Sequence, residues 1–197
     1  MTDAKDREAL LKIARDAIEA HLSGTRACAR VSSDLAARHA SVFVTVYCRH
    51  ELRGCIGRIV VDRPLVEAIE DCARSAASAD PRFPPISLVE LPDLDVELSL
   101  LGPLEAIAAA SEVEIGRHGL VVERDGRRGL LLPQVATEWN WNAEMFLART
   151  CQKAGLPFDA WKHGAKIWRF EAEVFGDVTD RASARSDARR STDAPSR

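Results

Sequence analysis

Two strand-like segments separated by only two residues restrict the fold more than any other feature of this chain. Residues 41–48 alternate β-branched and aromatic side chains with others, and residues 51–61 follow as a second such segment. Strands joined by so short a connection pair antiparallel, so Arg49 and His50 are predicted to form the turn of a β-hairpin. This part of the chain therefore predicts an antiparallel sheet.

The spacing of apolar residues also predicts helices and further strands. Apolar side chains at helical spacing predict helices over residues 5–22, 65–76 and roughly 142–154. Gly24 and Gly155 follow the ends of the first and last of these, and Asn142 is the expected N-cap of the last. Strands are predicted at residues 95–101, 119–123, 129–132 and 167–175. Hairpin-connected strands with helices between them predict an α+β fold with mainly antiparallel sheet.

Two segments are predicted to lack regular structure. Residues 80–85, Asp-Pro-Arg-Phe-Pro-Pro, contain three prolines, which remove three backbone donors and restrict three backbone angles. This segment is expected to be a stiff linker. Residues 177–197 are rich in Ala, Ser, Asp, Thr and Arg, and they contain almost no large apolar side chain, which predicts a disordered polar tail.

The composition describes a folded protein with balanced charge. The chain has 197 residues, 46% of them hydrophobic, and a formal net charge of -3, which suits one globular unit or two small lobes. No segment approaches the roughly 20 apolar residues of a membrane helix, and the charged first ten residues do not resemble the start of a secretory signal. We therefore expect a cytoplasmic protein with no membrane association and no strong DNA binding.

The cysteines and histidines do not form a recognisable metal or cofactor motif. The five cysteines are Cys28, Cys48, Cys55, Cys72 and Cys151. No two of them form a C-x-x-C pair, the histidines are equally scattered, and no glycine-rich nucleotide loop is present. An odd number of cysteines fits a reducing compartment with free thiols. We expect no metal and no cofactor.

Residues 52–57, Leu-Arg-Gly-Cys-Ile-Gly, contain the strongest candidate for chemistry. On a strand, Arg53 and Cys55 share one face at about 6.5–7 Å, so the guanidinium can favour the thiolate. Two glycines inside a strand often mark the close approach of a ligand or of another backbone. The alternative is that Cys55 lies opposite Val44 and is a packed apolar side chain. Arg53 then needs a partner, either an internal carboxylate or a ligand.

Three further positions are candidates, each with a structural alternative. His118 lies between two glycines just before a strand, where it can contact an anion or act as a base, or belong to a polar turn. Gln134 follows a buried strand at the start of a helix, where it can be either a site residue or a capping or surface residue. Cys151 lies in the last turn of a helix, where a core position is the alternative.

Four tryptophans are concentrated in the last third of the chain. They are Trp139, Trp141, Trp161 and Trp168. Exposed tryptophans can stack a nucleobase, whereas buried ones form the core or the interface between lobes. The sequence leaves both alternatives open.

Five blocks of sequence, in order, resemble the landmarks of the AMMECR-type domain. They are residues 52–57, 80–85, 116–120, 129–134 and 150–156. The resemblance covers roughly residues 8–176 and extends to the bacterial and archaeal members of the AmmeMemoRadiSam group. Arg49 and His50 depart from the pattern, because relatives often have Asn-Gly there, and Asn142 stands where Asp is common.

The resemblance implies a fold, a set of site residues and partners, but no reaction. It implies an AMMECR-type domain over residues 1–176, with two lobes that divide near residues 80–95 and a cleft between them. Carried over by position, it implies ligand-binding roles for Arg53, Gly54, Gly57, Arg82, Gln134 and Cys151, and catalytic roles for Cys55 and His118. It also implies a Memo-like protein and a radical SAM protein as partners, and a nucleotide or RNA as ligand.

Three hypotheses of function follow. The first is a cytosolic ligand-binding or accessory component that acts beside an enzyme modifying RNA or another macromolecule. The second is a cysteine-dependent enzyme in which Arg53 activates Cys55 and His118 is the acid–base partner. The third is a protein-interaction scaffold. An undisturbed thiol and an occupied anion pocket favour the first, a thiol with a lowered pKa close to an imidazole favours the second, and a flat dry surface without a cleft favours the third.

Overall fold

The structure is a computed structural model that describes residues 2–26 and 31–177. The chain divides into two compact units. Unit 1 comprises the described residues up to Leu100 together with those from Glu173 onward, and unit 2 comprises Leu101–Ala172. Residues 80–95, where the resemblance implies a division, lie within unit 1. Cys28 and residues 178–197, which include nearly all of the predicted tail, lie outside the described residues.

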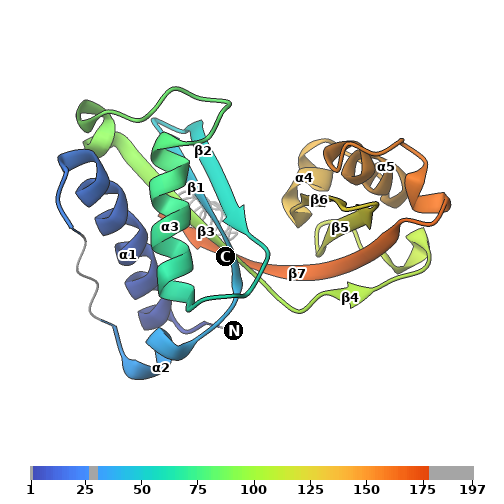
Figure 1. Cartoon of the computed structure of the whole chain (residues 1–197), viewed down its shortest axis with the longest axis horizontal. Helices are drawn as coiled ribbons and strands as arrows, with labels where there is room; N and C mark the ends of the chain where they lie inside the picture. The colour runs from blue at the N-terminus through green and yellow to red at the C-terminus, as the bar shows by residue number, and fades with distance from the viewer. Residues whose placement is uncertain (1, 27–30, 178–197) are drawn as a thin grey trace, which may run out of the picture. The chain divides into compact units, whose positions relative to one another are not determined.

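Unit 1 is a sheet with helices on one face (Figure 1). Its elements are α1 (Ala4–Ser23), α2 (Ser33–Ala37), β1 (Ser41–Cys48), β2 (Glu51–Arg58), α3 (Leu65–Ser78), the 3-10 helix η1 (Leu88–Asp93), β3 (Leu94–Leu101) and the end of β7 (Lys166–Gly176). The strand order is β2-β1-β3-β7, and α1 and α3 pack beside each other on the sheet. The core forms where their apolar faces meet Val42, Val44 and Val46.

The predicted hairpin is present, with Arg49 and His50 as its turn. Both residues have positive φ, 51° and 72°. A two-residue turn of this kind requires positive φ at both positions, which Asn-Gly adopts more readily than Arg-His. The second strand ends at Arg58 rather than at Val61.

The pairing register of the hairpin differs by one residue from the predicted one. The register shifts near the turn, and Arg53 has no partner residue on β1. Cys55 consequently lies opposite Thr45, and its predicted position opposite Val44 is wrong. An extra residue of this kind does not disturb the alternation that a sequence shows, so the pattern could not predict it. Because side chains alternate between faces, Cys55 lies on the face opposite the buried Val44.

Unit 2 is a smaller antiparallel sheet with short helices. Its elements are β4 (Glu105–Ala106), η2 (Ala110–Glu112), β5 (His118–Arg124), β6 (Arg127–Leu131), α4 (Pro133–Glu138), α5 (Ala143–Lys153), η3 (Ala160–Lys162) and the first part of β7. The strand β7 pairs with β5 and with the short β4, and β5 pairs with β6. The core contains Leu120, Phe146 and Leu147, all fully buried.

The α+β class with antiparallel sheet is confirmed, and so are most of the predicted element ends. Gly24 ends α1 with φ of 69°, and Asn142 accepts the Met145 backbone N–H at 2.9 Å as the N-cap of α5. The predicted helix start near Gln134 is present as α4, whereas α2 and the short β4 were not predicted, since both are too short to show a period. None of the helices among the described residues is both long and apolar enough to cross a membrane.

Candidate functional site

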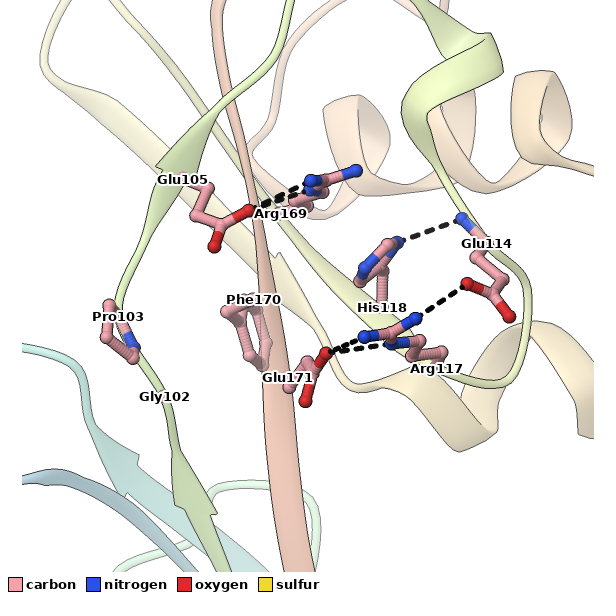
Figure 2. Close-up of a pocket in the computed structure, with 9 residues that line it drawn as sticks. All are labelled: Gly102, Pro103, Glu105, Glu114, Arg117, His118, Arg169, Phe170 and Glu171. Atoms are coloured by element: carbon pink, nitrogen blue, oxygen red, sulfur yellow. Dashed lines mark hydrogen bonds and ion pairs between the residues drawn. The ribbon is translucent and has the colours of Figure 1, made fainter.

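A polar cavity of about 450 Å³ lies within unit 2, beside the start of β5 and the middle of β7 (Figure 2). Its lining residues are Gly102, Pro103, Glu105, Glu114, Arg117, His118, Arg169, Phe170 and Glu171. Its volume lies within the range of small-molecule sites in proteins. This cavity is the candidate functional site.

Strand pairing brings these residues together from distant parts of the chain. In the pairing of β5 with β7, His118 lies opposite Glu171, and Gly119 lies opposite Phe170. The short β4 places Glu105 opposite Arg169 on the other side of β7. A Cβ atom at Gly119 would lie 2.3 Å from the Phe170 ring, so the glycine allows this ring to pack against β5. The cavity therefore depends on long-range pairing.

His118 is held in one protonation state by its surroundings. Its Nδ1 accepts the Glu114 backbone N–H at 2.9 Å, and the residue is only 7% exposed. Burial lowers the pKa of His118 below its ordinary 6.5, and the positive charges of Arg169 and Arg117 lower it further. The ring is therefore neutral at pH 7, with its one proton on Nε2. His118 can thus donate a hydrogen bond to a ligand oxygen, in the way a neutral imidazole polarises a carbonyl group.

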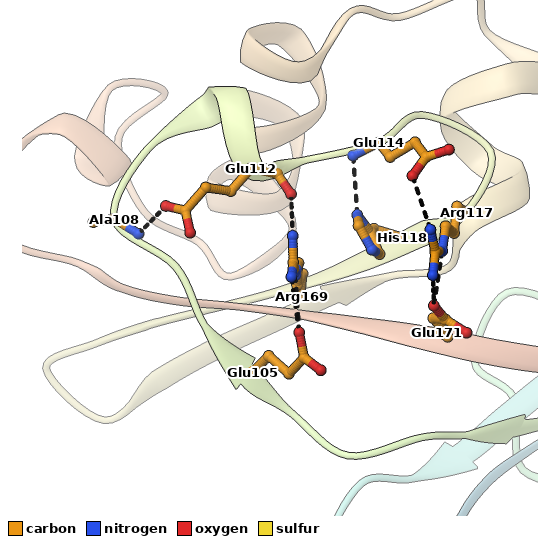
Figure 3. A network of polar contacts seen from close by, with 8 residues as sticks. All are labelled: Glu105, Ala108, Glu112, Glu114, Arg117, His118, Arg169 and Glu171. Atoms are coloured by element: carbon orange, nitrogen blue, oxygen red, sulfur yellow. Dashed lines mark hydrogen bonds and ion pairs between the residues drawn. The ribbon is translucent and has the colours of Figure 1, made fainter.

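A network of ion pairs surrounds His118 (Figure 3). Arg169 donates through Nε and Nη2 to Glu105 Oε2, both at 3.0 Å, and through Nη1 to the Glu112 carbonyl oxygen at 2.7 Å. Arg117 donates to Glu171 Oε1 at 2.7 Å and to Glu114 Oε2 at 3.2 Å. These carboxylates raise the pKa of Arg117 above its ordinary value. Both guanidinium groups are therefore engaged within the protein.

The network determines which kind of ligand the cavity suits. The lining contains three carboxylates, two guanidinium groups and a neutral imidazole, and the guanidinium groups already bind the carboxylates. A simple anion would compete with these carboxylates for the same donors. A neutral molecule with hydroxyl or amine groups can instead donate to the carboxylate oxygens and accept from His118. The geometry favours a polar ligand without a strong negative charge.

Cys55, in unit 1, lies in a different environment from the one that the sequence suggested. The residue is half-buried, and its Sγ accepts the Thr45 hydroxyl at 3.4 Å. Its backbone N–H donates to Asp80 Oδ2 at 2.9 Å, and its carbonyl oxygen accepts from Arg82 Nη2 at 3.3 Å. Asp80 and Arg82 also bind each other, at 2.7 Å. Asp80 and Arg82 together thus satisfy the backbone N–H and carbonyl oxygen of Cys55 on the outer side of the edge strand β2.

The guanidinium of Arg53 has internal partners. Its Nε donates to Glu90 Oε1 at 2.8 Å and its Nη1 to the Pro84 carbonyl oxygen at 3.1 Å. The hydrogen bond from Arg53, together with those from the Ser87 backbone and hydroxyl, lowers the pKa of Glu90 to about 2. Of the two partners that the sequence left open for Arg53, an internal carboxylate is present, at Glu90. A different guanidinium, that of Arg82, donates to the Cys55 carbonyl oxygen, and the pKa of Arg82 is raised mainly by its hydrogen bond to Asp80.

Packing explains why residues 54 and 57, in the hexapeptide 52–57, are both glycine. A Cβ atom at Gly54 would lie 2.0 Å from the Ala76 carbonyl oxygen of α3, and one at Gly57 would lie 2.1 Å from the Phe43 ring. The close approach predicted from the two glycines is therefore made by a helix backbone and by an aromatic side chain.

The remaining candidates lie in unit 2 but do not line the cavity around His118. Cys151 is fully buried, and burial raises the pKa of its thiol. Gln134 is half-buried in α4, and its buried Oε1 lacks a hydrogen-bond partner among the described residues. Cys55 belongs to unit 1 and His118 to unit 2.

The sequence interpretation missed the charged residues around His118. Glu105, Arg169 and Glu171 were not singled out, because each is an ordinary charged residue in the sequence. One signal was present: Arg169 and Glu171 lie two residues apart on a strand, on either side of the buried Phe170. Charges at that spacing indicate one polar face of a strand.

The fold and the cavity define a class of α+β domain built on antiparallel sheets, and comparison with known proteins gives the family. The AMMECR1 family model matches residues 11–175, and the chain belongs to this family. A protein of Methanothermobacter thermautotrophicus is 47% identical over 176 residues, which are 84% of this chain and 91% of that protein. One from Methanocaldococcus jannaschii is 43% identical over 180 residues, 87% of this chain and 90% of that protein.

A solved structure has the same fold. It is the crystal structure of the uncharacterized protein PH0010 from Pyrococcus horikoshii, with a TM-score of 0.83 and 40% sequence identity. The match covers 89% of this chain and 93% of that one. The resemblance seen in the sequence is thus confirmed at the level of family and fold.

Proposed function

We propose that this protein is a ligand-binding component that holds a small polar molecule in the cavity around His118. The observation that carries the proposal is the hydrogen bond from the Glu114 backbone N–H to His118 Nδ1. It leaves the Nε2–H, on the opposite side of the ring, as a donor toward a ligand (Figure 2). Carboxylate oxygens of Glu105 and Glu171 line the same cavity as acceptors. Donor and acceptors together suit a molecule with hydroxyl or amine groups.

We further propose that the protein acts as an accessory component in the cytosol, beside a Memo-like protein and a radical SAM protein, in the modification of RNA or another macromolecule. Membership of the AMMECR1 family supports this proposal. Co-expression with the two partners, followed by size-exclusion chromatography, tests it; separate elution of all three would contradict it.

Replacing His118 with asparagine tests the cavity directly. The Asn side-chain oxygen can take the place of Nδ1 and accept the Glu114 N–H, whereas the Nε2–H donor is lost. We expect small molecules that co-purify with the native protein to be lost, or their occupancy to fall about tenfold, as the loss of one hydrogen bond predicts. Mass spectrometry of the released molecules measures this.

A matched control for this variant is His163→Asn. His163 is exposed and interacts with Asp159 away from the cavity. It should retain the same bound molecules as the native protein. Equal occupancy in His118→Asn and in the native protein would contradict the proposal.

A cysteine-dependent enzyme that uses Cys55 is the second candidate, because its thiol lies on the face away from the valine core and near Arg82. The positive charge of Arg82 is, however, largely offset by the carboxylate of Asp80. We therefore expect iodoacetamide to label Cys55 no faster than an ordinary free thiol, and Arg82→Gln to change the rate less than about threefold. Buried Cys72, whose pKa burial raises to about 11, should label only on unfolding. Fast labelling of Cys55 that depends on Arg82 would favour the enzyme.

A further inference from the structure

A second cavity of unit 2 has an aromatic lining. It has a volume of about 510 Å³ and is lined by Leu131, Trp139, Trp141, Arg149, Gln152 and Lys153. None of these residues lines the cavity around His118. The two cavities are therefore separate sites of the same unit.

The end of helix α4 positions the two tryptophans. Asn140 has φ of 55°, a left-handed conformation that asparagine tolerates better than most residues, and it stops the helix between them. The Trp141 backbone N–H donates back to the Ala136 carbonyl oxygen at 2.9 Å. The rings of Trp139 and Trp141 are stacked, with centroids 6.0 Å apart and an angle of 18° between their planes. Trp139 is nevertheless 67% exposed, so it has free ring surface for a ligand.

Two cations of α5 line this cavity without acidic partners. The guanidinium of Arg149 lies 5.6 Å from the centre of the Trp141 ring and donates to Gln152 Oε1 at 3.0 Å. In the part of the chain that the structure describes, neither Arg149 nor Lys153 forms an ion pair with a carboxylate, in contrast to Arg117 and Arg169. No carboxylate lines the cavity. Lys153 also offsets the negative end of the dipole of α5. The site therefore has an excess of positive charge.

We propose that this cavity binds a nucleotide, with its base stacked on Trp139 and its phosphate near Lys153 and Arg149. A flat aromatic group that carries a negative charge satisfies both properties of the site. Stacking of a base on an aromatic side chain contributes about 1–3 kcal/mol, and ion pairing with phosphate adds to it. An exposed tryptophan can also anchor a protein partner, but an apolar partner would leave the two cations without a counter-charge.

The nucleotide can be free or part of an RNA strand, since both present the same base and phosphate. Isothermal titration calorimetry with AMP and with an eight-residue oligoadenylate separates the two sources. Oligoadenylate that binds more tightly than AMP, with a steep dependence on salt, indicates a strand. Equal affinity per site indicates a free nucleotide. Ribose 5-phosphate, which lacks the base, should bind at least about tenfold more weakly than AMP.

Five variants, two of them controls, test the roles of the side chains. Trp139→Ala should weaken AMP binding about tenfold or more, and Trp139→Phe should restore it to within about threefold. Lys153→Gln should weaken binding about threefold and reduce its salt dependence, whereas the matched control Lys166→Gln, on β7, should leave it unchanged. His118→Asn should bind AMP like the native protein, so this inference and the proposed function can fail separately.

Three results would overturn the inference. They are the absence of saturable heat with both AMP and oligoadenylate at millimolar concentration, equal affinity of Trp139→Ala and the native protein, and equal binding of AMP and ribose 5-phosphate. If nucleotides do not bind and Trp139→Ala instead abolishes self-association in sedimentation velocity, the surface is a protein contact. Circular dichroism should show the Trp139 and Lys153 variants folded, because both residues are exposed, and the same spectra verify the fold of His118→Asn.

Discussion

Replacing Gly54 with alanine should destabilise the protein by about 3 kcal/mol. The added Cβ atom would lie 2.0 Å from the Ala76 carbonyl oxygen, and this contact is with the backbone of α3. A helix backbone cannot move aside without disturbing the packing of α3 on β1 and β2, so the cost is that of an overpacked core. Urea unfolding followed by circular dichroism measures the free energy of unfolding.

The same substitution at Gly57 is the matched control. Its added Cβ atom would meet the ring of Phe43, a side chain that can rotate away. We expect a loss of about 1 kcal/mol there. Equal losses for Gly54→Ala and Gly57→Ala, or a loss below about 0.5 kcal/mol for Gly54→Ala, would contradict this account of the hexapeptide.

Replacing Asp80 with asparagine should remove about 2 kcal/mol of stability at pH 7. The Asp80 side chain is only 2% exposed, and it accepts hydrogen bonds from Arg82 and from the Cys55 backbone N–H. The bond from Arg82 is the main reason that the pKa of Asp80 lies well below its ordinary value, and the backbone N–H groups of Cys55 and Arg82 add to it. Substitution weakens these bonds and leaves the guanidinium without its counter-charge.

This prediction includes a dependence on pH. A carboxyl with a lowered pKa in the folded state contributes stability that is fully present above its unfolded value of about 3.9 and is lost as the pH falls further. The difference between the native protein and Asp80→Asn should therefore be constant from pH 7 to about pH 5 and then shrink. Asp125→Asn, at an exposed hairpin turn, is the control and should change the stability at pH 7 by less than about 0.5 kcal/mol. A difference for Asp80→Asn that persists unchanged down to pH 2 would contradict the role of the charge.

Local periodicity explains what the sequence could predict. The helix α1, the hairpin turn at Arg49 and His50, and the caps Gly24 and Asn142 each depend on residues within a few positions of one another. Such features leave a mark in the pattern of apolar, glycine and capping residues. They therefore also supported the α+β class.

Long-range contacts explain what the sequence could not predict. Arg53 pairs with Glu90, which is 37 residues away in the sequence, and Arg169 pairs with Glu105, which is 64 residues away. Nothing in the local pattern of either residue identifies its partner. The extra residue in β2 likewise leaves the alternation of side chains intact while it moves Cys55 to the opposite face from the one expected. The cavity around His118 depends on pairings of this kind.

The neutral state of His118 is the central claim, and its ring nitrogens can be observed directly. Long-range ¹H–¹⁵N correlation spectra at pH 7 distinguish a protonated from an unprotonated ring nitrogen, and the His118→Asn variant assigns the signals. We predict a proton on Nε2, none on Nδ1, and a ring pKa below its ordinary value, because burial lowers the pKa and Nδ1 accepts the Glu114 N–H. A proton on Nδ1 at pH 7, or a doubly protonated ring, would contradict the role of His118 as a neutral donor to the ligand.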